Sequence, residues 1–257
     1  MNKKSIIIKF GGSVLTDKSK EENVLDNKVQ SLIQITSDLV KKSIFEDIVL
    51  IHGAGSFGHP IAKKFNLDGN FRENTSEGIV KTLFGVRTLN QHLLEMCLQQ
   101  ELPAVSVFLS NAGLGEINEL NFQKVVKELL NFGMIPLTGG DILFLKNKKY
   151  RIVSGDEIVR ILVETMVLPT VIMVSDTKGV YDQDGKTIQV LNEEMFKNLG
   201  QTITGAVGVD VTGGMRQKIL ELFSIKTKAQ KIVICSWENF EEVIYGDYTN
   251  ATQIISK

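Results

Sequence analysis

Short apolar runs that end in glycine constrain the fold of this chain most. Residues 5–10 form an Ile-rich run that Gly11 and Gly12 break, and residues 48–51 lead into the segment His52-Gly53-Ala54-Gly55-Ser56-Phe57-Gly58-His59-Pro60. Runs of this kind are typical of strands that are buried on both faces of a parallel sheet. Glycines after a strand permit sharp turns and bring backbone N–H groups close to a ligand. By itself the 52–60 segment is equally consistent with a phosphate-binding turn and with an ordinary strand-to-helix turn.

Strand-like and helix-like stretches alternate over almost all of the 257 residues. This alternation predicts an α/β protein with a mainly parallel central sheet and helices on both faces, a three-layer αβα sandwich. No repeat or linker divides the chain, so we expect one domain over residues 1–257, with a small excursion near residues 182–205. The predicted strands are 5–10, 48–51, 104–108, 134–138, 142–145, 151–153, 170–175 and, as the last strand, 231–235; the predicted helices are 26–42, 60–65, 75–100, 118–132, 154–167 and 212–228.

Composition narrows the classes of function. The net charge of −1 provides no global field that would favour nucleic acid or an anionic membrane, so neither partner is expected. Cys97 and Cys235 lie among apolar residues and outside any CxxC pattern, which predicts buried thiols rather than a disulfide or a zinc site. Lys9 ends the N-terminal apolar run too early for a signal peptide, and no stretch has transmembrane length. A cytoplasmic location is therefore expected.

Glycine-bearing turns follow strands or open helices at five places. Ligands collect beyond the carboxyl ends of the strands in sheets of this class, so these turns should converge on one edge. Their number, and the charges beside them, predict a site for a highly phosphorylated ligand. The five turns are Gly11-Gly12, the 52–60 segment, Gly139-Gly140-Asp141, Ser154-Gly155-Asp156 and Gly213-Gly214.

Lysines stand where phosphoryl transfer would need positive charge. Lys9 ends the first strand, Lys18 follows the first turn, and Lys218 lies early on a helix with a Gly-rich start. Phosphoryl transfer depends on positioning and on neutralising the charge of the moving group. Lys9 is the most informative of the three, because a lysine inside an apolar strand is costly unless it has a partner or a role. Lys63 and Lys64 are interpreted as a solvated face.

Three aspartates are candidates for binding magnesium or a lysine, namely Asp141, Asp156 and Asp176. Asp156 could instead interact favourably with a helix N-terminus, and Asp141 could be an ordinary turn residue. The chain has no GxxxxGK[ST] pattern and no Gly-x-Ser-x-Gly elbow. The loose GxGxxG run in the 52–60 segment follows the second strand rather than the first.

The order of these motifs resembles that of the amino acid kinase family over nearly the whole chain. Within the family, the 52–60 segment with His59 is most similar to that of the isopentenyl phosphate kinases. The matching segments are Lys9-Phe10-Gly11-Gly12-Ser13, the 52–60 segment, the middle Gly-Asp turns, Arg151-Ile152-Val153-Ser154-Gly155-Asp156-Glu157-Ile158, Ser175-Asp176-Thr177-Lys178-Gly179-Val180-Tyr181, and Asp210-Val211-Thr212-Gly213-Gly214-Met215 leading to Lys218.

The resemblance implies transfer of the ATP γ-phosphoryl group to isopentenyl phosphate by a homodimer that uses Mg²⁺ held mainly by the ATP phosphates. It places the acceptor site in the half before about residue 165 and the nucleotide site in the half after about residue 166. Lys178 stands where many relatives have aspartate, so its role stays open. The implied catalytic residues are His59, Lys9, Lys18 and Lys218; the acceptor would contact Gly53, Ala54, Gly58, His59 and Gly155; the nucleotide would contact Lys9, Gly11, Gly12, Ser13, Gly55, Asp176, Gly213, Gly214 and Lys218; Asp141 and Asp156 would support them.

The residues leave two other functions open. One is a kinase for another small phosphate or phosphonate, as in fosfomycin kinases, and the other is a non-catalytic nucleotide- or anion-binding protein of the same fold. A prenyl tail would need an apolar cavity, for which residues 79–86 are candidate lining, whereas a small epoxide would not. Retention of Lys9, Lys18, His59 and Lys218 together argues against a non-catalytic protein. His52, at the strand end, is assigned a structural role.

Overall fold

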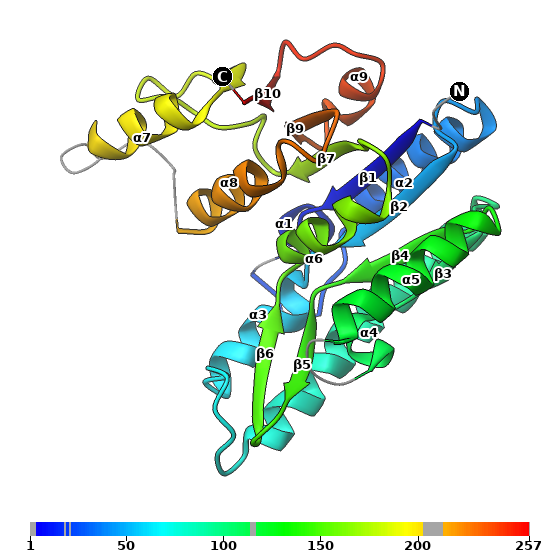
Figure 1. Ribbon diagram of the computed structural model, residues 1–257, viewed down its shortest axis with the longest axis vertical. Helices are drawn as coiled ribbons and strands as arrows, with labels where there is room; N and C mark the ends of the chain where they lie inside the picture. Colours follow the sequence, from blue (N-terminus) through cyan, green and yellow to red (C-terminus); the bar gives the residue numbers. More distant parts are fainter. Residues whose placement is uncertain (1–3, 18, 21, 114–116, 203–212, 257) are drawn as a thin grey trace.

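The computed structural model describes residues 4–256 except 18, 21, 114–116 and 203–212. Within these residues, eight strands form one sheet in the order β3-β4-β2-β1-β7-β9-β10-β8, and β5 and β6 form a separate hairpin (Figure 1). The strands are β1 (Ser5–Phe10), β2 (Asp47–His52), β3 (Ala104–Ser106), β4 (Ile135–Gly139), β5 (Asp141–Leu145), β6 (Lys149–Val153), β7 (Thr170–Ser175), β8 (Val190–Leu191), β9 (Lys231–Ser236) and β10 (Ala251–Ile254).

The prediction of a mainly parallel sheet is confirmed. β1 lies at its centre and pairs in parallel with β2 and with β7, and the pairs β2–β4, β3–β4 and β7–β9 are also parallel. The expectation that residues 231–235 form the last strand is wrong, because β10 follows and pairs antiparallel to β9. β10 has the sequence Ala-Thr-Gln-Ile, which has neither a long apolar run nor a glycine boundary. Its place in the sheet depends on backbone pairing that the sequence pattern does not reveal.

Helices cover both faces of the sheet, which confirms the three-layer αβα architecture. Alternate β1 residues divide between the two sides: Ile7 packs in a core with α5, α6 and α8, whereas Ile6 and Ile8 pack in a core with α1, α2, α4 and α9. The helices are α1 (Gly12–Leu15), α2 (Asp26–Lys41), α3 (Gly55–Lys64), α4 (Thr75–Gln99), α5 (Ile117–Asn131), α6 (Gly155–Leu162), α7 (Glu193–Thr202), α8 (Gly213–Ile225) and α9 (Phe240–Ile244), with 3₁₀ turns η1 (Leu109–Ala112) and η2 (Val163–Thr165).

Helix α3 begins earlier than the sequence indicates. The prediction starts the helix at Pro60, after the glycine-rich segment. The helix actually begins at Gly55, so that most of the predicted glycine-rich loop is its first turns. Thr16 provides the missing start signal from a distant part of the chain, because its hydroxyl accepts a hydrogen bond from the Ser56 N–H at 2.8 Å. The N-terminus of α3 thus lies at the carboxyl edge of the sheet, next to the end of β2.

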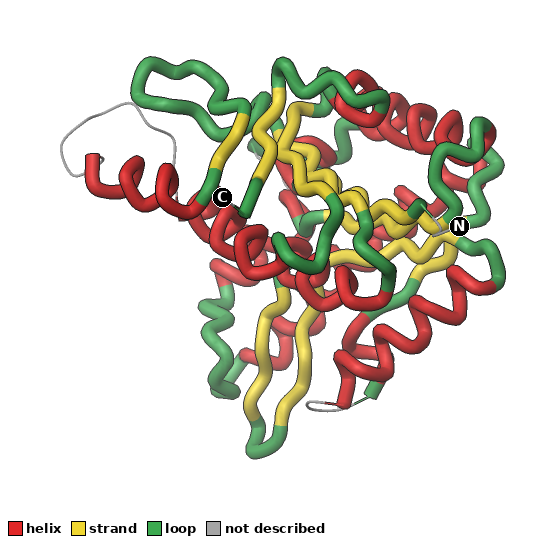
Figure 2. The backbone as a smooth tube through the Cα atoms, turned by 45° about the horizontal axis from the view of Figure 1, so that its top comes forward, coloured by secondary structure: helices red, strands yellow, loops and turns green. Residues whose placement is uncertain are grey.

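The β5–β6 hairpin projects from the carboxyl edge of the main sheet, beside α3 and α4 (Figure 2). Of the polar stretch near residues 182–205, the described part contains β8, which is the edge strand of the main sheet beside β10, and α7. Cys97 and Cys235 are free and buried, and burial raises the pKa of each thiol to about 12. None of the described helices combines the length and the apolar character that crossing a bilayer requires.

Candidate active site

Two cavities meet at the carboxyl edge of the sheet. The first, which we call the apolar cavity, has a volume of about 330 Å³ and extends between α3, α4 and the β5–β6 hairpin. The second, the polar cavity, has a volume of about 610 Å³ and lies between β1, α3, α6 and α8. Both are lined by Lys9, Gly12, His59 and Asp156, so the two spaces share one charged boundary.

Four of the five predicted turns converge on this boundary. Gly12, Gly53, Gly140 and Gly155 all line the apolar cavity. The first two turns touch so closely that a Cβ on Gly53 would lie 2.5 Å from the Gly12 nitrogen. Thr16 holds them together, because its hydroxyl donates to the Gly12 carbonyl at 2.8 Å while accepting from the start of α3. The result is a wall of backbone from which N–H groups can face an anion.

Lys9 and Asp156 form an ion pair at the centre of the boundary. The Lys9 ammonium lies 2.7 Å from the Asp156 carboxylate, and only 6% of Lys9 is exposed. Asp156 is in the first turn of α6, whose N-cap Ser154 accepts the Glu157 N–H as the capping pattern predicts. Burial alone would raise the pKa of Asp156, but Lys9, Lys218 and His59 together outweigh it and hold the pKa below its usual value. The carboxylate is therefore charged and compensates part of the positive charge.

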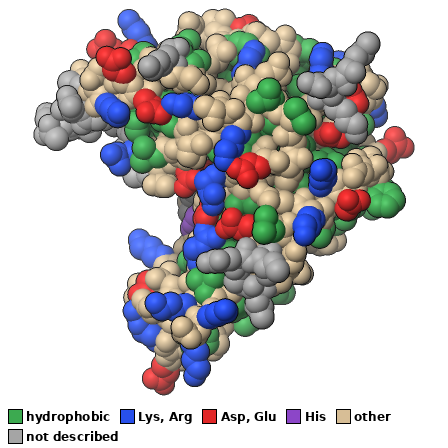
Figure 3. Space-filling view, viewed as in Figure 1, with side chains coloured by type: hydrophobic (Ala, Val, Ile, Leu, Met, Phe, Trp, Pro, Cys, Tyr) green, Lys and Arg blue, Asp and Glu red, His purple; other side chains and the backbone are tan. Residues whose placement is uncertain are grey.

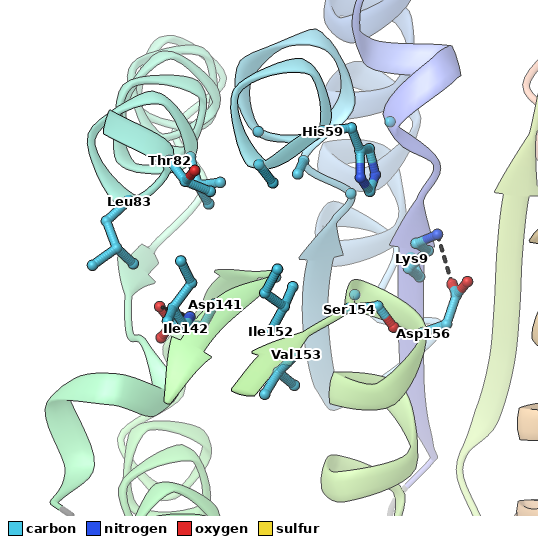
Figure 4. A pocket seen from close by; sticks show the side chains of 18 of the residues that line it. Lys9, His59, Thr82, Leu83, Asp141, Ile142, Ile152, Val153, Ser154 and Asp156 are labelled. Carbon is cyan, nitrogen blue, oxygen red and sulfur yellow. Dashed lines mark hydrogen bonds and ion pairs between the residues drawn. The ribbon is translucent and has the colours of Figure 1, made fainter. Parts of the chain in front are cut away.

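His59 projects from α3 into the boundary, close to the Lys9–Asp156 pair (Figure 4). Thr82 and Leu83 lie at the opposite end of the apolar cavity, with Ile142 and Ile152 between the two ends. The cavity thus has a charged end and an apolar end. A ligand that joins an anionic group to a short hydrocarbon tail would match both.

The walls of the apolar end come from α3, α4 and the β5–β6 hairpin. Thr82, Leu83 and Val86 on α4 belong to the predicted stretch 79–86, whereas Ile79 packs behind them in a small cluster with Ile142 and Tyr150. The hairpin contributes residues that the sequence did not indicate. The side chains along the apolar wall are Ala62, Thr82, Leu83, Val86, Ile142, Ile152 and Val153.

His52 supports the backbone wall from behind. It is fully buried; its Nε2 lies 3.1 Å from the Asn90 side-chain nitrogen and its Nδ1 lies 3.2 Å from the Gly53 carbonyl oxygen. The Ser106 hydroxyl donates to the Asn90 side-chain oxygen, so the Asn90 NH₂ faces His52. Nε2 must then accept, which leaves the ring proton on Nδ1 to donate to Gly53. Burial lowers the pKa of His52 to about 4, with smaller contributions from Arg87 and Lys9 opposed by the Gly53 carbonyl.

Asp141 has an arginine as its partner rather than a lysine. Its buried carboxylate accepts from Arg87 at 2.8 Å and from the backbone N–H groups of Ser110 and Ile142. The Arg87 guanidinium also stacks on the Phe108 ring, with its carbon 3.3 Å from the ring centroid. Asp141 therefore joins α4, η1 and the start of β5, and it positions the hairpin.

The remaining predicted residues divide into three groups. Gly11, Ser13, Gly55 and Lys218 line the polar cavity, and Ala54 and Gly58 line the apolar one. Asp176 is exposed directly after β7 and lines neither cavity; Gly213 and Gly214 begin α8, which presents Gln217 and Lys218 to the site. Lys18 lies outside the described residues.

Several lining residues were missed by the sequence reasoning. Ser56 and Ser175 line the polar cavity, and so does Lys63, which was interpreted only as part of a solvated face. Helical spacing from His59 could have indicated Ala62 and Lys63, which lie three and four positions further along α3. Ser175 ends β7, where strand-end reasoning applies equally well. The hairpin residues carried no comparable signal.

The open face of the molecule shows a hollow in which a histidine is visible, with lysine or arginine side chains around it (Figure 3). Among the described residues, no group of three or more His, Cys, Asp or Glu is arranged to hold a metal ion. Asp156 is the one carboxylate among the described residues that line the polar cavity, and Lys9 already neutralises it. The donor set therefore suits a magnesium ion that arrives on a phosphorylated ligand better than one held by the protein alone.

Known proteins are similar to this chain in sequence and in fold. The amino acid kinase family model matches residues 4–236. The isopentenyl phosphate kinase of Methanothermobacter thermautotrophicus is 30% identical over 98% of this chain and 99% of its own, and that of Methanocaldococcus jannaschii is 30% identical over 83% and 84%. The crystal structure of the T. acidophilum isopentenyl phosphate kinase product complex superimposes with a TM-score of 0.77 at 21% identity, covering 97% of this chain and 99% of that one. Acetylglutamate kinases match a similar share of the chain at lower identity, for example that of Colwellia psychrerythraea at 25% over 93% of this chain and 92% of its own. The chain belongs to the amino acid kinase family, and the two relatives named above at 30% identity are isopentenyl phosphate kinases.

Proposed function

We propose that the protein transfers the γ-phosphoryl group of ATP to isopentenyl phosphate, giving isopentenyl diphosphate and ADP. One observation carries the proposal: an apolar cavity opens onto a charged boundary that it shares with a second, polar cavity. A prenyl monophosphate would fill the first space, with its tail toward Leu83 and its phosphate toward His59. The phosphates of ATP would fill the second. The two reacting groups then meet where the cavities join.

The acceptor phosphate would lie against the first turns of α3. Gly53, Ala54 and Gly58 offer backbone there, Gly155 offers it from the start of α6, and a helix N-terminus attracts anions. His59 would donate to the acceptor phosphate or to the transferring group, since it lines both cavities. His52 would keep the Gly53 peptide in place without touching the substrate.

The nucleotide phosphates would lie over Gly11, Gly12, Ser13 and Gly55 in the polar cavity, with Lys218 beside them. The acceptor would thus lie mainly in the first half of the chain, to about residue 165, whereas the donor phosphates would contact both halves, with Ser175 and Lys218 coming from the half after about residue 166. Asp176, Gly213 and Gly214 would extend the nucleotide site, and Lys18 is assigned to the phosphates by resemblance alone. Magnesium would be held mainly by the ATP phosphates and would neutralise their charge.

The chemistry needs positioning more than proton transfer. A phosphate monoester is already ionised near neutral pH, so its oxygen can attack without a strong general base. The obstacle is repulsion between two anions, and cations at the shared boundary reduce it. Lys9 is held there by Asp156 at 2.7 Å, so its ammonium is in place before the substrates bind.

The apolar cavity distinguishes this function from the alternatives. A kinase for a small epoxide phosphonate would have no use for an apolar end of this kind, and a protein that only binds anions would need no second cavity. Turnover should be compared for isopentenyl phosphate and fosfomycin with Mg-ATP, following ADP release and the diphosphate product by phosphorus NMR. Turnover of fosfomycin but not of isopentenyl phosphate would reject the proposal.

The resemblance also extends to assembly, and we expect a homodimer. Light scattering after size-exclusion chromatography measures the mass directly. A mass of one chain at micromolar concentration would contradict this expectation.

A further inference from the structure

Helix α3 separates the two cavities, and its side chains match the cavity that each one faces. Gly58 and Ala62 line the apolar cavity only, whereas Ser56, Pro60 and Lys63 line the polar cavity only. His59 lines both. One turn beyond His59, the neighbouring residues Ala62 and Lys63 thus place a methyl group toward the apolar cavity and an ammonium group toward the polar cavity. This division follows helical spacing, since residues three or four apart share a face.

The charges that line the polar cavity are not balanced. Among the described residues around it, three lysines face a single carboxylate: Lys9, Lys63 and Lys218 against Asp156. Asp156 is bound to Lys9 at 2.7 Å, so much of the Lys9 charge is compensated within the protein. A nucleoside triphosphate remains an anion even with one magnesium ion bound. Lys63 adds a further positive charge on the α3 side of this cavity.

Lys63 has the properties of a cation that is available to a ligand. It is exposed, and within the described part of the chain no carboxylate lies within ion-pair distance of its ammonium group. Lysine is a flexible point charge that can follow a phosphate. One structural role competes with this: Lys63 and Lys64 both lie in the last turn of α3, where cations interact favourably with the helix dipole. Lys64 shares that role but lines neither cavity.

We propose that Lys63 binds the phosphates of the donor nucleotide, as an additional cation of the phosphoryl-transfer site. The inference rests on the proposed function, because it identifies the contents of the polar cavity as the donor phosphates. It assigns Lys63 to the donor and not to the acceptor, since Lys63 lines the polar cavity alone. Lys63 therefore contributes to affinity for the nucleotide from α3, the helix that also carries His59.

The test compares Lys63→Met with Lys64→Met. The two variants remove one charge each from neighbouring positions in the same helical turn, and methionine keeps much of the apolar stem. Lys63→Met should raise the KM for ATP by about ten- to a hundredfold, as expected for loss of a hydrogen bond to a charged group. Lys64→Met should change it by less than about twofold, since exposed charges away from the ligand are screened at physiological salt. The KM for isopentenyl phosphate should stay the same in both.

Two results would overturn the proposal. Equal KM values for ATP in the two variants would show that Lys63 acts only through the helix dipole or the net charge. A rise confined to the KM for isopentenyl phosphate would place Lys63 on the acceptor. Calorimetry with Mg-ATP alone separates this proposal from the proposed function: if the wild-type protein binds Mg-ATP but does not phosphorylate isopentenyl phosphate, the function fails, while weaker binding by Lys63→Met than by Lys64→Met still supports the role of Lys63.

Discussion

The two cavities beside α3 are built by different means. The polar cavity is formed by turns at strand ends and by charged side chains, whereas the apolar end of the other cavity is formed by side chains of α4 and of the β5–β6 hairpin. Backbone turns at a sheet edge are fixed by the fold, so the part of the polar cavity that these turns form changes little with side-chain identity. The apolar end of the other cavity depends instead on a few aliphatic side chains. The difference indicates that phosphate handling and tail selection can be altered separately, and each prediction below tests that separation.

Substitution of His59 should have the largest effect on the rate, because His59 lines both cavities. His59→Ala should lower kcat by about a hundred- to a thousandfold, the usual loss when one donor to a transition-state charge is removed. His59→Gln should lose less, because it retains a donor. Steady-state kinetics measure the rates, and circular dichroism with thermal unfolding verifies the fold. A rate for His59→Ala within about threefold of the wild-type rate, less than about 1 kcal/mol, would show that His59 has no such role.

The stability of the protein should depend on pH through His52, which supports the backbone wall from behind. Its pKa is about 4 in the folded protein, below the ordinary value for histidine, so below about pH 6.5 the unfolded chain binds the proton preferentially. Its contribution to the free energy of unfolding is complete above about pH 6.5, and about 3 kcal/mol is lost as the pH falls to about 4. His52→Gln should flatten the dependence of denaturation midpoints on pH in this window.

His92→Gln provides the control for the His52 prediction, because His92 is a more exposed histidine, on the surface of α4, and should leave the steep dependence in place. An equally steep loss in His52→Gln would contradict the prediction. NMR titration of the wild-type imidazole is an independent check, since His52 should stay neutral at pH 5.5.

A substitution in the wall of the apolar cavity should change the KM of one substrate only. Ile152→Asp places a carboxylate on the hairpin beside the tail cavity, at a position 42% exposed that can accept a charge without unfolding. The KM for isopentenyl phosphate should rise by about tenfold or more, because burying an unpaired charge against a hydrocarbon tail is costly. The KM for ATP should not change. Phe144→Asp is the matched control, as Phe144 lies on the same hairpin, is 40% exposed and does not line the cavity. Equal effects of the two substitutions would mean that the hairpin acts through its charge alone.

The smallest expected effect is a change in the free energy of unfolding on substitution of Thr82, which lines the apolar cavity. The Thr82 hydroxyl is buried without a hydrogen-bond partner among the described residues, although the side chain lines the apolar cavity. Thr82→Val should raise the free energy of unfolding by about 1 kcal/mol, since it removes an unsatisfied polar group at constant shape. Thr36→Val should not, because the Thr36 hydroxyl bonds to the Leu32 carbonyl at 2.8 Å. Urea unfolding of both variants provides the comparison, and a destabilised Thr82→Val would point to a partner for this hydroxyl.

Much of the fold and of the polar cavity could be predicted from the sequence. Lys9 was recognisable because an ammonium inside an apolar strand requires compensation, and the structure places Asp156 against it. The turn at Gly11 and Gly12 was recognisable because glycine after a buried strand permits close backbone approach. Both features can be recognised from residues that are neighbours in the sequence, because each would be costly without a structural or functional role.

Other features depend on contacts between distant parts of the chain. The start of α3 at Gly55 requires the Thr16 hydroxyl, and nothing within residues 52–60 indicates it. Asp141 could be seen as a turn residue, but its partner Arg87 lies 54 positions earlier, on α4. Ile142 and Ile152 are ordinary strand residues in sequence, and they line a cavity only because the hairpin leaves the main sheet beside α4.

The sequence by itself determined the αβα architecture, the glycine-bearing turns at the carboxyl edge of the sheet and the lysine at the end of β1, because periodicity, glycine and buried charge have direct local consequences. Tertiary structure alone decided how α3 separates the two cavities, which histidine lines both of them and which aliphatic side chains line the apolar cavity. His52 and His59 stand seven positions apart in one segment, yet packing buries the first behind the Gly53 carbonyl and opens the second to both cavities. The orientation of a side chain depends on what the rest of the fold places around it, and that information is not local.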